Sequence, residues 1–353
     1  MRIPLITNAD ELPEPLRSSL SNDERAAIAK AVPPFAVTPF YAGLAGPRAD
    51  DPIRRQCIPD PREATISPGE SPDPLGAHRH QVTRRLVHQY PSRVLLLSTG
   101  RCAGYCRHCF RRDWELFTDG WLNREEIAEA CAYIASHPQV DEVLVSGGDP
   151  LSADNAQVES LLTALRAVRE GLVIRLGTRL PVTWPFRVDD ALVELLARLR
   201  PLRLILHINH PRELAPEVAE ALQRLVDRGI PVHTQTVLLK GVNDDADTLA
   251  DLFRRLVILG ASPYYLFQGD LARGTGHLRT DLSTAVGLYR VLSERLSPLA
   301  LPTLAVDLPG GLGKKALPPD FEPLMANGAP YPAYRLVSRT GEACLYPRDG
   351  GTE

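Results

Sequence analysis

The stretch Arg93-Val-Leu-Leu-Leu-Ser-Thr-Gly-Arg-Cys102-Ala-Gly-Tyr-Cys106-Arg-His-Cys109 joins an apolar run to three closely spaced cysteines. A short apolar run bounded by polar residues is typical of a buried strand. The spacing C-x3-C-x2-C would seldom arise by chance in a 353-residue chain with six cysteines. Three thiolates on one loop can hold three irons of a cubane 4Fe–4S cluster and leave the fourth iron without a protein ligand. We therefore expect Cys102, Cys106 and Cys109 to bind such a cluster.

Two other interpretations of the cysteine loop remain open. A structural zinc site usually takes four ligands, often from two cysteine pairs that lie far apart in the sequence. His108 lies between two of the cysteines, but the chain has no second close pair. Cysteines can also be inert buried residues that contribute only packing. The shared short loop favours the iron–sulfur cluster over both alternatives.

Outward from this loop, short apolar runs alternate with longer segments of helical period. The expected strands are Val94–Ser98, Glu142–Ser146, Val173–Leu176, Leu202–His207, Val232–Leu238, Pro263–Leu266 and Leu304–Val306. The expected helices are Arg124–Ser136, Val158–Val168, Asp189–Leu199, Ala215–Arg228, Ala246–Leu259 and Thr284–Leu296. This alternation favours βαβ units with parallel strands, and apolar strands favour burial on both faces. We expect an α/β fold, namely a partial, six-stranded (β/α)6 barrel.

Three segments are expected along the chain. Residues 1–87 form an N-terminal extension, which is Pro-rich between residues 32 and 74 and carries a helical pattern at Asp23–Val32 and a basic amphipathic stretch at Thr83–His88. Residues 88–308 form the barrel core, and residues 309–353 form a Gly-rich lysine loop and a short C-terminal tail. Pro-rich stretches are typical of irregular chain rather than of regular elements.

The polar motifs follow the expected strands at their C-terminal ends. The cysteine loop follows the first strand, Ser146-Gly-Gly-Asp149 ends the second, His207 ends the fourth, and Asp270 follows a later one. Active sites of barrels built from parallel strands gather at this end. The placement therefore predicts one shared site at the mouth of the barrel.

Composition excludes several classes of protein. The net charge is −3, with 44% hydrophobic and 24% charged residues, which is ordinary for a globular protein and carries no nucleic-acid footprint. No apolar run is long enough to span a membrane, and the N-terminus lacks the apolar stretch of a secretory signal. Reduced thiolates and an oxygen-sensitive cluster fit the cytoplasm, which is the location we expect.

Several segments resemble a known family. The cysteine spacing is similar to that of the radical S-adenosylmethionine (SAM) superfamily. More specifically, the chain resembles the lysine 2,3-aminomutase family over roughly residues 50–320, in the segments Tyr90–Cys109, Ser146–Leu151, His207–Pro211, Gln235–Asp244 and Asp307–Lys314. Because these segments occur in the family's order, the resemblance does not rest on one pattern.

The resemblance implies a SAM site beside the cluster. SAM is expected to chelate the open iron, and the residues expected to contact SAM are His108, Ser146, Gly147, Gly148, Asp149, His207 and Gln235. The two glycines would let the backbone come close to the methionyl part without a Cβ clash. Asp149 would pair with the ammonium group of SAM. Taken alone, His207 and Gln235 are polar residues that a barrel mouth can hold for other reasons.

The resemblance also implies pyridoxal phosphate (PLP), held covalently by Lys314 on the loop Asp307-Leu-Pro-Gly-Gly-Leu-Gly-Lys314. Lys315 is the adjacent rival, and a surface basic pair is the plain alternative. The phosphate is expected at Arg93, with Tyr90 as a hydroxyl donor and the backbone of Leu308, because an arginine fork can donate two hydrogen bonds to phosphate. Two departures from the family, Gln89 in place of a basic residue and Leu312 within a glycine run, put the affinity for PLP in doubt.

Three charged residues are implied to bind the substrate. Arg111 matches the position that binds the substrate carboxylate, or it serves only to balance the charge of the cluster. Asp270 and Asp307 match the pair that grips the distal ammonium of lysine, or they cap helices and loops. Two carboxylates brought together in a closed barrel repel each other, and one of them tends to hold a proton unless a cation binds.

The family implies an isomerase that converts L-lysine to β-lysine by moving the amino group from C2 to C3. The alternatives are the shorter branch that makes β-lysine for a translation elongation factor, an aminomutase for another amino acid such as arginine, and a non-catalytic iron–sulfur redox protein. Expected partners are free lysine and an electron donor such as flavodoxin or ferredoxin, with no nucleic acid or membrane. No zinc is expected, since the tail carries only Cys344 and Asp245 follows Asp244 where a zinc cysteine would lie, which leaves a homo-oligomer possible.

Overall fold

The computed structural model describes residues 3–114 and 119–348. Its centre is a nine-stranded sheet whose strands follow one another in sequence order. The strands are β1 (Leu86–Tyr90), β2 (Arg93–Thr99), β3 (Glu142–Gly147), β4 (Val173–Thr178), β5 (Leu202–His207), β6 (Val232–Leu238), β7 (Ser262–Gln268), β8 (Thr303–Leu308) and β9 (Gly313–Ala316).

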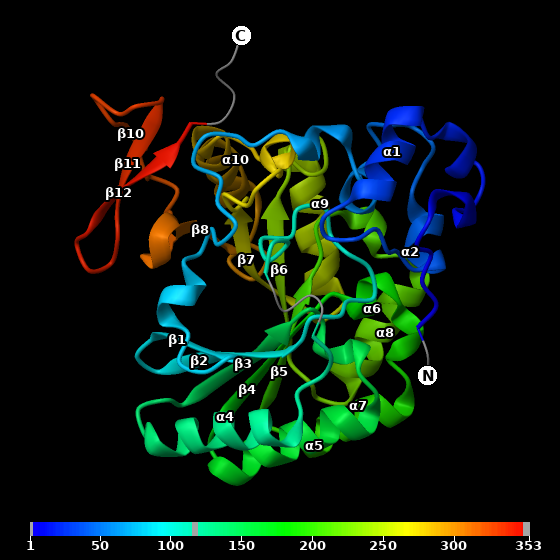
Figure 1. Cartoon of the computed structure of the whole chain (residues 1–353), viewed down its shortest axis with the longest axis vertical. Coiled ribbons are helices and arrows are strands. Elements are labelled where there is room, and N and C mark those ends of the chain that lie inside the picture. The colour runs from blue at the N-terminus through cyan, green and yellow to red at the C-terminus, as the bar shows by residue number, and fades with distance from the viewer. Residues whose placement is uncertain (1–2, 115–118, 349–353) are drawn as a thin grey trace.

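Seven of these strands, β2 to β8, pair in parallel, and β1 and β9 add antiparallel strands at the two edges. Six crossovers carry helices over the outer face of the sheet (Figure 1). The larger crossover helices are α4 (Arg124–Ser136), α5 (Asn155–Val168), α7 (Asp190–Arg198), α8 (Pro216–Asp227), α9 (Ala246–Ile258) and α10 (Leu282–Arg295). The prediction of a partial (β/α)6 barrel is confirmed, with β8 as a seventh parallel strand after the sixth unit.

Side-chain caps fix where the crossover helices begin. Asn123 and Asp154 form capping boxes at the starts of α4 and α5, and Asp245 accepts a hydrogen bond from the backbone N–H of Thr248 at the start of α9. Each cap satisfies backbone donors that the first helical turn leaves unpaired. The apolar residues of these helices then pack on the sheet in one continuous core.

The expected strands and helices lie close to the observed ones. The bounds of β5, β6 and α4 are as predicted, and the other crossover elements differ by one to three residues at an end. The basic amphipathic stretch Thr83–His88 runs into strand β1, which the sequence did not predict. The pairing of Leu86 with Leu96 buries the first residues of β1 against β2.

Burial along the strands alternates more than predicted. In β4 and β6 every second residue is buried under the helices, while the residues between them, such as His233 and Gln235, are only partly buried. The expectation of burial on both faces is therefore wrong for these strands. The partly buried face of these strands carries polar side chains such as His233 and Gln235, as the wall of a binding site can.

The N-terminal extension carries α1 (Asn22–Lys30), α2 (Pro39–Leu44) and α3 (Arg54–Cys57) and lies beside the cysteine loop. The backbone N–H of Tyr105 donates to Ala36, and buried Arg107 and Arg112 both pair with Glu63. The remaining short helices are α6 (Leu180–Thr183) and the 3-10 turns Ala9–Glu11, Arg17–Ser19, Pro61–Ala64, Ala77–His80, Pro150–Ser152, Pro185–Arg187, Pro211–Glu213, Gly276–Leu278 and Pro309–Gly311. The extension thus fixes the loop from the side away from the barrel.

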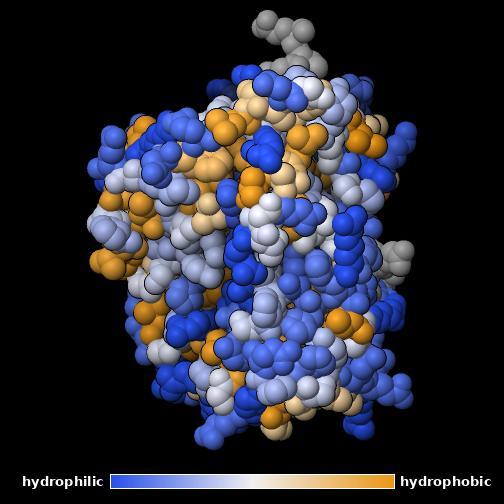
Figure 2. All heavy atoms as spheres, turned by 90° about the vertical axis from the view of Figure 1, so that its left-hand side faces the viewer, coloured by the Kyte–Doolittle hydropathy of each residue, from blue (hydrophilic) through white to orange (hydrophobic). Residues whose placement is uncertain are grey.

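A second sheet of three strands, β10 (Leu324–Met325), β11 (Ala333–Val337) and β12 (Ala343–Pro347), follows the barrel. It projects at the left of Figure 1, and Figure 2 shows that hydrophobic side chains on this face form small groups among polar ones. The sequence did not predict this sheet. No helix of the described ranges has the length and apolar character needed to cross a membrane. The division into residues 1–87, 88–308 and 309–353 stays a prediction.

Candidate active site

The three cysteines lie on the loop that follows β2, and all three are free, partly buried thiols. Burial, with repulsion from Cys106 as the next cause, raises the pKa of Cys109 to about 11. Burial raises the pKa of Cys102 well above its usual value, with Asp149, Cys109 and Cys106 adding to the effect. Because burial and neighbouring thiols disfavour the charged forms of Cys102 and Cys109, these two thiols need a nearby cation to become thiolates. A cationic cluster meets that need, so the loop fits the expected group.

Arg179, which sequence reasoning missed, lies against the cluster loop. It follows the end of β4, and its Nη1 donates to the Sγ of Cys106 at 2.6 Å. Its Nη2 donates to Tyr41, Gln56 and the carboxylate of Glu213. A charged residue directly after a parallel strand, in Gly-Thr-Arg179, was a usable signal, because polar residues at that end of a barrel point to the site.

His108 and His207 come together as expected. Their Nε2 atoms are 2.9 Å apart, the rings stack, and the side-chain amide of Asn209 lies within hydrogen-bond distance of both. Burial lowers the pKa of both imidazoles well below the usual value, so the pair is neutral. Donor atoms of Cys106, His108 and His207 all lie within 4.8 Å of one another, which places the histidines beside the cluster loop. Gln235 is the neighbour of His207 across the β5–β6 pairing.

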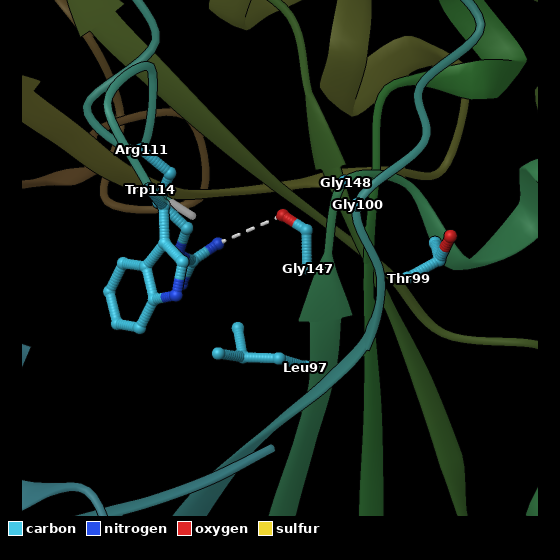
Figure 3. A pocket seen from close by; sticks show the side chains of 7 residues that line it. All are labelled: Leu97, Thr99, Gly100, Arg111, Trp114, Gly147 and Gly148. Carbon is cyan, nitrogen blue, oxygen red and sulfur yellow. Dashed lines mark hydrogen bonds between the residues drawn. The ribbon is translucent and has the colours of Figure 1, made fainter. Parts of the chain in front are cut away.

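Packing against the backbone of the cysteine loop requires glycine at positions 147 and 148. A Cβ on Gly147 would lie 2.3 Å from the carbonyl oxygen of Thr99, and one on Gly148 would lie 2.1 Å from that of Arg101. The glycine pair therefore lets the turn after β3 pack against the backbone of the cysteine loop. Both glycines also line a pocket, which Figure 3 shows with Arg111 pointing toward Gly147. A contact with SAM in that pocket stays a prediction.

Arg111 crosses this pocket and touches the turn after β3. Its Nη1 lies 3.2 Å from the hydroxyl of Ser146 and 3.4 Å from the carbonyl oxygen of Gly147, while its Nε is buried without a partner in the described chain. Leu97 and Trp114 line the same pocket (Figure 3). An arginine with an unused buried donor is suited to bind a carboxylate.

The carboxylate of Asp149 forms its hydrogen bonds with other residues of the protein. Its carboxylate accepts hydrogen bonds from the hydroxyl of Thr178 and from the backbone N–H groups of Leu151, Arg179 and Leu180. Burial nevertheless raises the pKa of the Asp149 carboxyl. These contacts hold the segment after β4 in place, and a direct contact with the ammonium of SAM stays a prediction.

Lys314 points into the lumen from β9. Its Nζ lies 2.7 Å from Oδ2 of Asp307 and 3.8 Å from the centre of the Phe267 ring. Lys315 points the other way, and its Nζ donates to the carbonyl oxygen of Val337 in the C-terminal sheet. Because successive side chains of a strand face opposite sides, only Lys314 lies where a lumen cofactor could reach it.

The loop before Lys314 is held from the edge of the barrel. The hydroxyl of Tyr90 accepts from the backbone N–H of Lys314, and the guanidinium of Arg93 lies 3.8 Å over the Tyr90 ring. The side chains of Arg79, His80 and Gln89 all reach the carbonyl oxygens of Gly310 or Gly311. Gln89 thus fastens the loop, and the buried Leu308 leads into it. An aromatic hydroxyl, an arginine and a lumen lysine fit PLP, although the individual contacts stay predictions.

Asp270 and Asp307 influence each other in the lumen. Burial, and then the neighbouring Asp307, raise the pKa of Asp270 to about 7, against opposing effects of Lys314 and Arg111. The expectation that one carboxyl of the pair tends to hold a proton is confirmed. Asp307 is the residue opposite Lys314 in the β8–β9 pairing, and its carboxylate pairs with that lysine. The site therefore contains two carboxyl groups, and the one ammonium group of Lys314 is not enough to neutralise both of them.

Comparison with known proteins agrees with this arrangement. A family model described as the Radical SAM superfamily matches residues 96–253. The chain is 48% identical to a putative L-lysine 2,3-aminomutase of Treponema pallidum, over 79% of each chain. It is 43% identical to a putative L-lysine 2,3-aminomutase of Aquifex aeolicus, over 82% of this chain and 78% of that protein. It is 39% identical to L-lysine 2,3-aminomutase of Fusobacterium nucleatum, over 86% of this chain and 72% of that protein. The chain belongs to the lysine 2,3-aminomutase family of the radical SAM superfamily.

Proposed function

We propose that the protein is an isomerase that converts L-lysine to β-lysine with the help of a 4Fe–4S cluster, SAM and PLP. The observation that carries the proposal is the acidic pair Asp270 and Asp307 beside Lys314, in which burial and Asp307 raise the pKa of Asp270 to about 7. When bound, the cluster and SAM supply a carbon radical able to remove hydrogen from an unactivated C–H bond, and PLP supplies conjugation that stabilises a radical beside nitrogen.

The residues would divide the work along the lumen. Cys102, Cys106 and Cys109 would hold three irons, with the neutral His108–His207 pair beside them. Lys314 would hold PLP, and Arg93 with Tyr90 would bind its phosphate. Placing both cofactors in one lumen would bring the hydrogen donor and the substrate within reach of each other, which removes the entropic cost of their encounter.

Substrate orientation would come from charges at two ends. Arg111 would bind the carboxylate, and Asp270 and Asp307 would bind the distal ammonium. In the structure the ammonium of Lys314 pairs with Asp307, so this carboxylate already binds an alkylammonium group like that of the substrate. A glutamate side chain would meet two carboxylates at this place and would be repelled.

The cationic substrate also changes protonation. Asp270 holds its proton up to about pH 7 because of burial and Asp307. A bound ammonium would lower the pKa of Asp270 and release that proton, so both carboxylates would then be charged. Each charge-assisted hydrogen bond contributes about 1.5–3 kcal/mol. Arginine carries the same charge and stays the main alternative substrate.

The experiment is an anaerobic incubation of the cluster-loaded, PLP-loaded protein with SAM, a one-electron reductant and each of L-lysine, L-arginine and L-glutamate. We expect β-lysine as the main 2,3-shifted product and none from glutamate. A loaded protein that cleaves SAM but shifts none of the three would refute the proposal. A protein that binds a cluster and never cleaves SAM would support a non-catalytic redox protein.

The product alone does not distinguish between the cellular uses of β-lysine, one of which is attachment to an elongation factor. A neighbouring gene for a lysyl-transferase-like protein, and modification of the factor by the purified pair, would favour that branch. We also propose an external donor of single electrons, such as flavodoxin or ferredoxin, and a cytoplasmic location, because the thiols must remain reduced. The oligomeric state and the absence of zinc stay predictions.

A further inference from the structure

Arg179 makes contacts that a purely structural arginine would not need. It is 8% exposed, and it places Nη1 2.6 Å from the Sγ of Cys106 while Nη2 pairs with Glu213. A buried ion pair with Glu213 alone would satisfy its charge. The additional contact aims one edge of the guanidinium at a thiol that the proposed cluster would use.

The guanidinium has little freedom to move away. Glu213, fully buried, accepts through Oε1 from Arg179 and from the hydroxyl of Tyr41, and through Oε2 from two backbone N–H groups, those of Asn209 and His210. Asp149 accepts from the backbone N–H of Arg179 itself. The side chain and the backbone of Arg179 are therefore held by separate groups, which keep the guanidinium beside Cys106 in this structure.

We propose that Arg179 raises the reduction potential of the cluster by donating a hydrogen bond to the thiolate of Cys106. The inference rests on the proposed function, because it assumes that the cluster binds at the three cysteines. In the step concerned, one electron passes from an external one-electron donor to the cluster, and no bond to Arg179 forms or breaks.

The direction of the effect follows from charge. Reduction adds one negative charge to a cluster whose three thiolates are already anionic, and a fixed cation stabilises the more negative state more. Hydrogen bonds to the sulfurs and net charge are two of the factors that set iron–sulfur potentials. Because Arg179 is largely buried, solvent and salt screen the interaction less than they would screen an exposed pair.

Glu213 gives the inference a second, opposite prediction. Its carboxylate neutralises part of the charge that Arg179 presents to Cys106. Glu213→Gln keeps one accepting oxygen, replaces the other with an NH2 group that cannot accept, and removes the negative charge, so it should make reduction easier. Arg179→Gln removes the positive charge and should make reduction harder. A role limited to holding the fold gives no reason for the two variants to shift in opposite directions.

Two further variants separate the effect of the positive charge of Arg179 from the effect of the hydrogen bonds that hold its side chain. Arg179→Lys keeps the positive charge but loses the fork, so it should retain more of the wild-type potential than Arg179→Gln. Tyr41→Phe removes the hydroxyl that bonds to both Arg179 and Glu213 without changing any charge. It should leave the equilibrium constant for reduction within about threefold of wild type.

The experiment is an anaerobic redox titration of the reconstituted full-length protein, followed by electron paramagnetic resonance of the reduced cluster. For Arg179→Gln we expect at least a tenfold fall in the equilibrium constant for reduction, which is about 59 mV for one electron. For Glu213→Gln we expect a rise. Iron content and cluster absorbance of the wild type are measured first. A wild type without a cluster refutes the proposed function, which is a separate failure.

The remaining outcomes decide the inference. A wild-type potential in Arg179→Gln overturns it, and so does an equal fall in Tyr41→Phe. Loss of SAM binding in Arg179→Gln at an unchanged potential would assign the residue to SAM and overturn it too. If Arg179→Gln does not retain the cluster, Glu213→Gln carries the test, since an unchanged or lower potential in that variant contradicts the inference.

Discussion

The two sides of the lumen differ in how completely they satisfy their own charges. On the cluster side, Asp149 accepts hydrogen bonds from four residues and Glu213 holds Arg179 in place. On the opposite side, Lys314 pairs with Asp307, and burial and Asp307 raise the pKa of Asp270 to about 7 even though Lys314, Arg111 and Arg279 oppose the rise. The cluster side is therefore hydrogen-bonded without any ligand, whereas on the substrate side a bound cation would favour the charged form of Asp270.

The largest effect is expected from breaking the cluster side. Cys106→Ala removes one of three iron ligands and should abolish both the visible absorbance of the reconstituted cluster and all SAM cleavage. Iron analysis and SAM cleavage under anaerobic conditions check this. Cys131→Ala, on α4, is the matched control and should keep the cluster. Full cluster content in Cys106→Ala would contradict the assignment of the loop.

The next effect concerns the two adjacent lysines. Lys314→Ala should remove the visible absorbance of covalently bound PLP and lower the rate of β-lysine formation by more than about a thousandfold. Lys315→Ala should keep the absorbance, because Lys315 bonds to Val337 outside the lumen. An absorbance band lost in Lys315→Ala and kept in Lys314→Ala would reverse the assignment.

Neutralising the acidic pair should have a smaller effect. Asp307→Asn removes one charge-assisted hydrogen bond of about 1.5–3 kcal/mol and should weaken lysine binding by roughly 10- to 150-fold. Binding of norleucine, which lacks the distal ammonium, should change little. Calorimetry on the PLP-loaded protein measures both, with Asp251→Asn on the outer helix α9 as the control. Equal losses for lysine and norleucine would count against an ammonium site.

The raised pKa of Asp270 predicts a pH dependence of lysine binding. Below about pH 7 Asp270 is protonated and the pair offers one charge, and above it the pair offers two. We expect lysine affinity to rise between pH 6 and pH 8 and proton release to accompany binding near pH 6.5. Titrations in buffers of different ionisation enthalpy measure the proton. Affinity that is flat over this range would show that Asp270 does not face the ammonium.

The smallest expected effect is on the free energy of unfolding of the ligand-free protein. A carboxyl whose pKa is raised on folding holds its proton in the folded state after the unfolded chain has lost it, so stability falls from about pH 4 to pH 7. Asp270→Asn removes this cost, and the variant should exceed the wild type by on the order of 2 kcal/mol at pH 8 and by little at pH 4. Denaturant unfolding at the two pH values checks this. A variant less stable than wild type at pH 8 would contradict it.

Local patterns predicted the parallel strands, since buried runs such as those of β5 and β6 need no distant information. They could not predict β1 or the C-terminal sheet, because antiparallel pairing of Leu86 with Leu96 or of Ala333 with Pro347 depends on where the chain returns. The cysteines and acidic residues were visible as spacings. Arg179 belongs to no such spacing; its position after a strand pointed to the site, but its partners Tyr41, Cys106 and Glu213 lie far away in sequence.

The glycine pair shows a further limit of sequence. Gly147 and Gly148 were assigned to close approach of SAM, but a Cβ at either position meets the backbone of Thr99 or Arg101 first. Asp149 likewise serves the segment after β4. Sequence indicated that these residues matter, and only the packing of two loops showed what they touch.

If the cluster and the acidic pair share one lumen, hydrogen passes between SAM and the lysine that Asp270 and Asp307 hold. The most direct measurement uses L-lysine deuterated at C3, with the loaded protein and SAM under reducing, anaerobic conditions. We expect β-lysine together with deuterium at the 5′ carbon of the recovered SAM. β-Lysine formed with no deuterium in SAM, or SAM cleavage that leaves lysine unchanged, would contradict it.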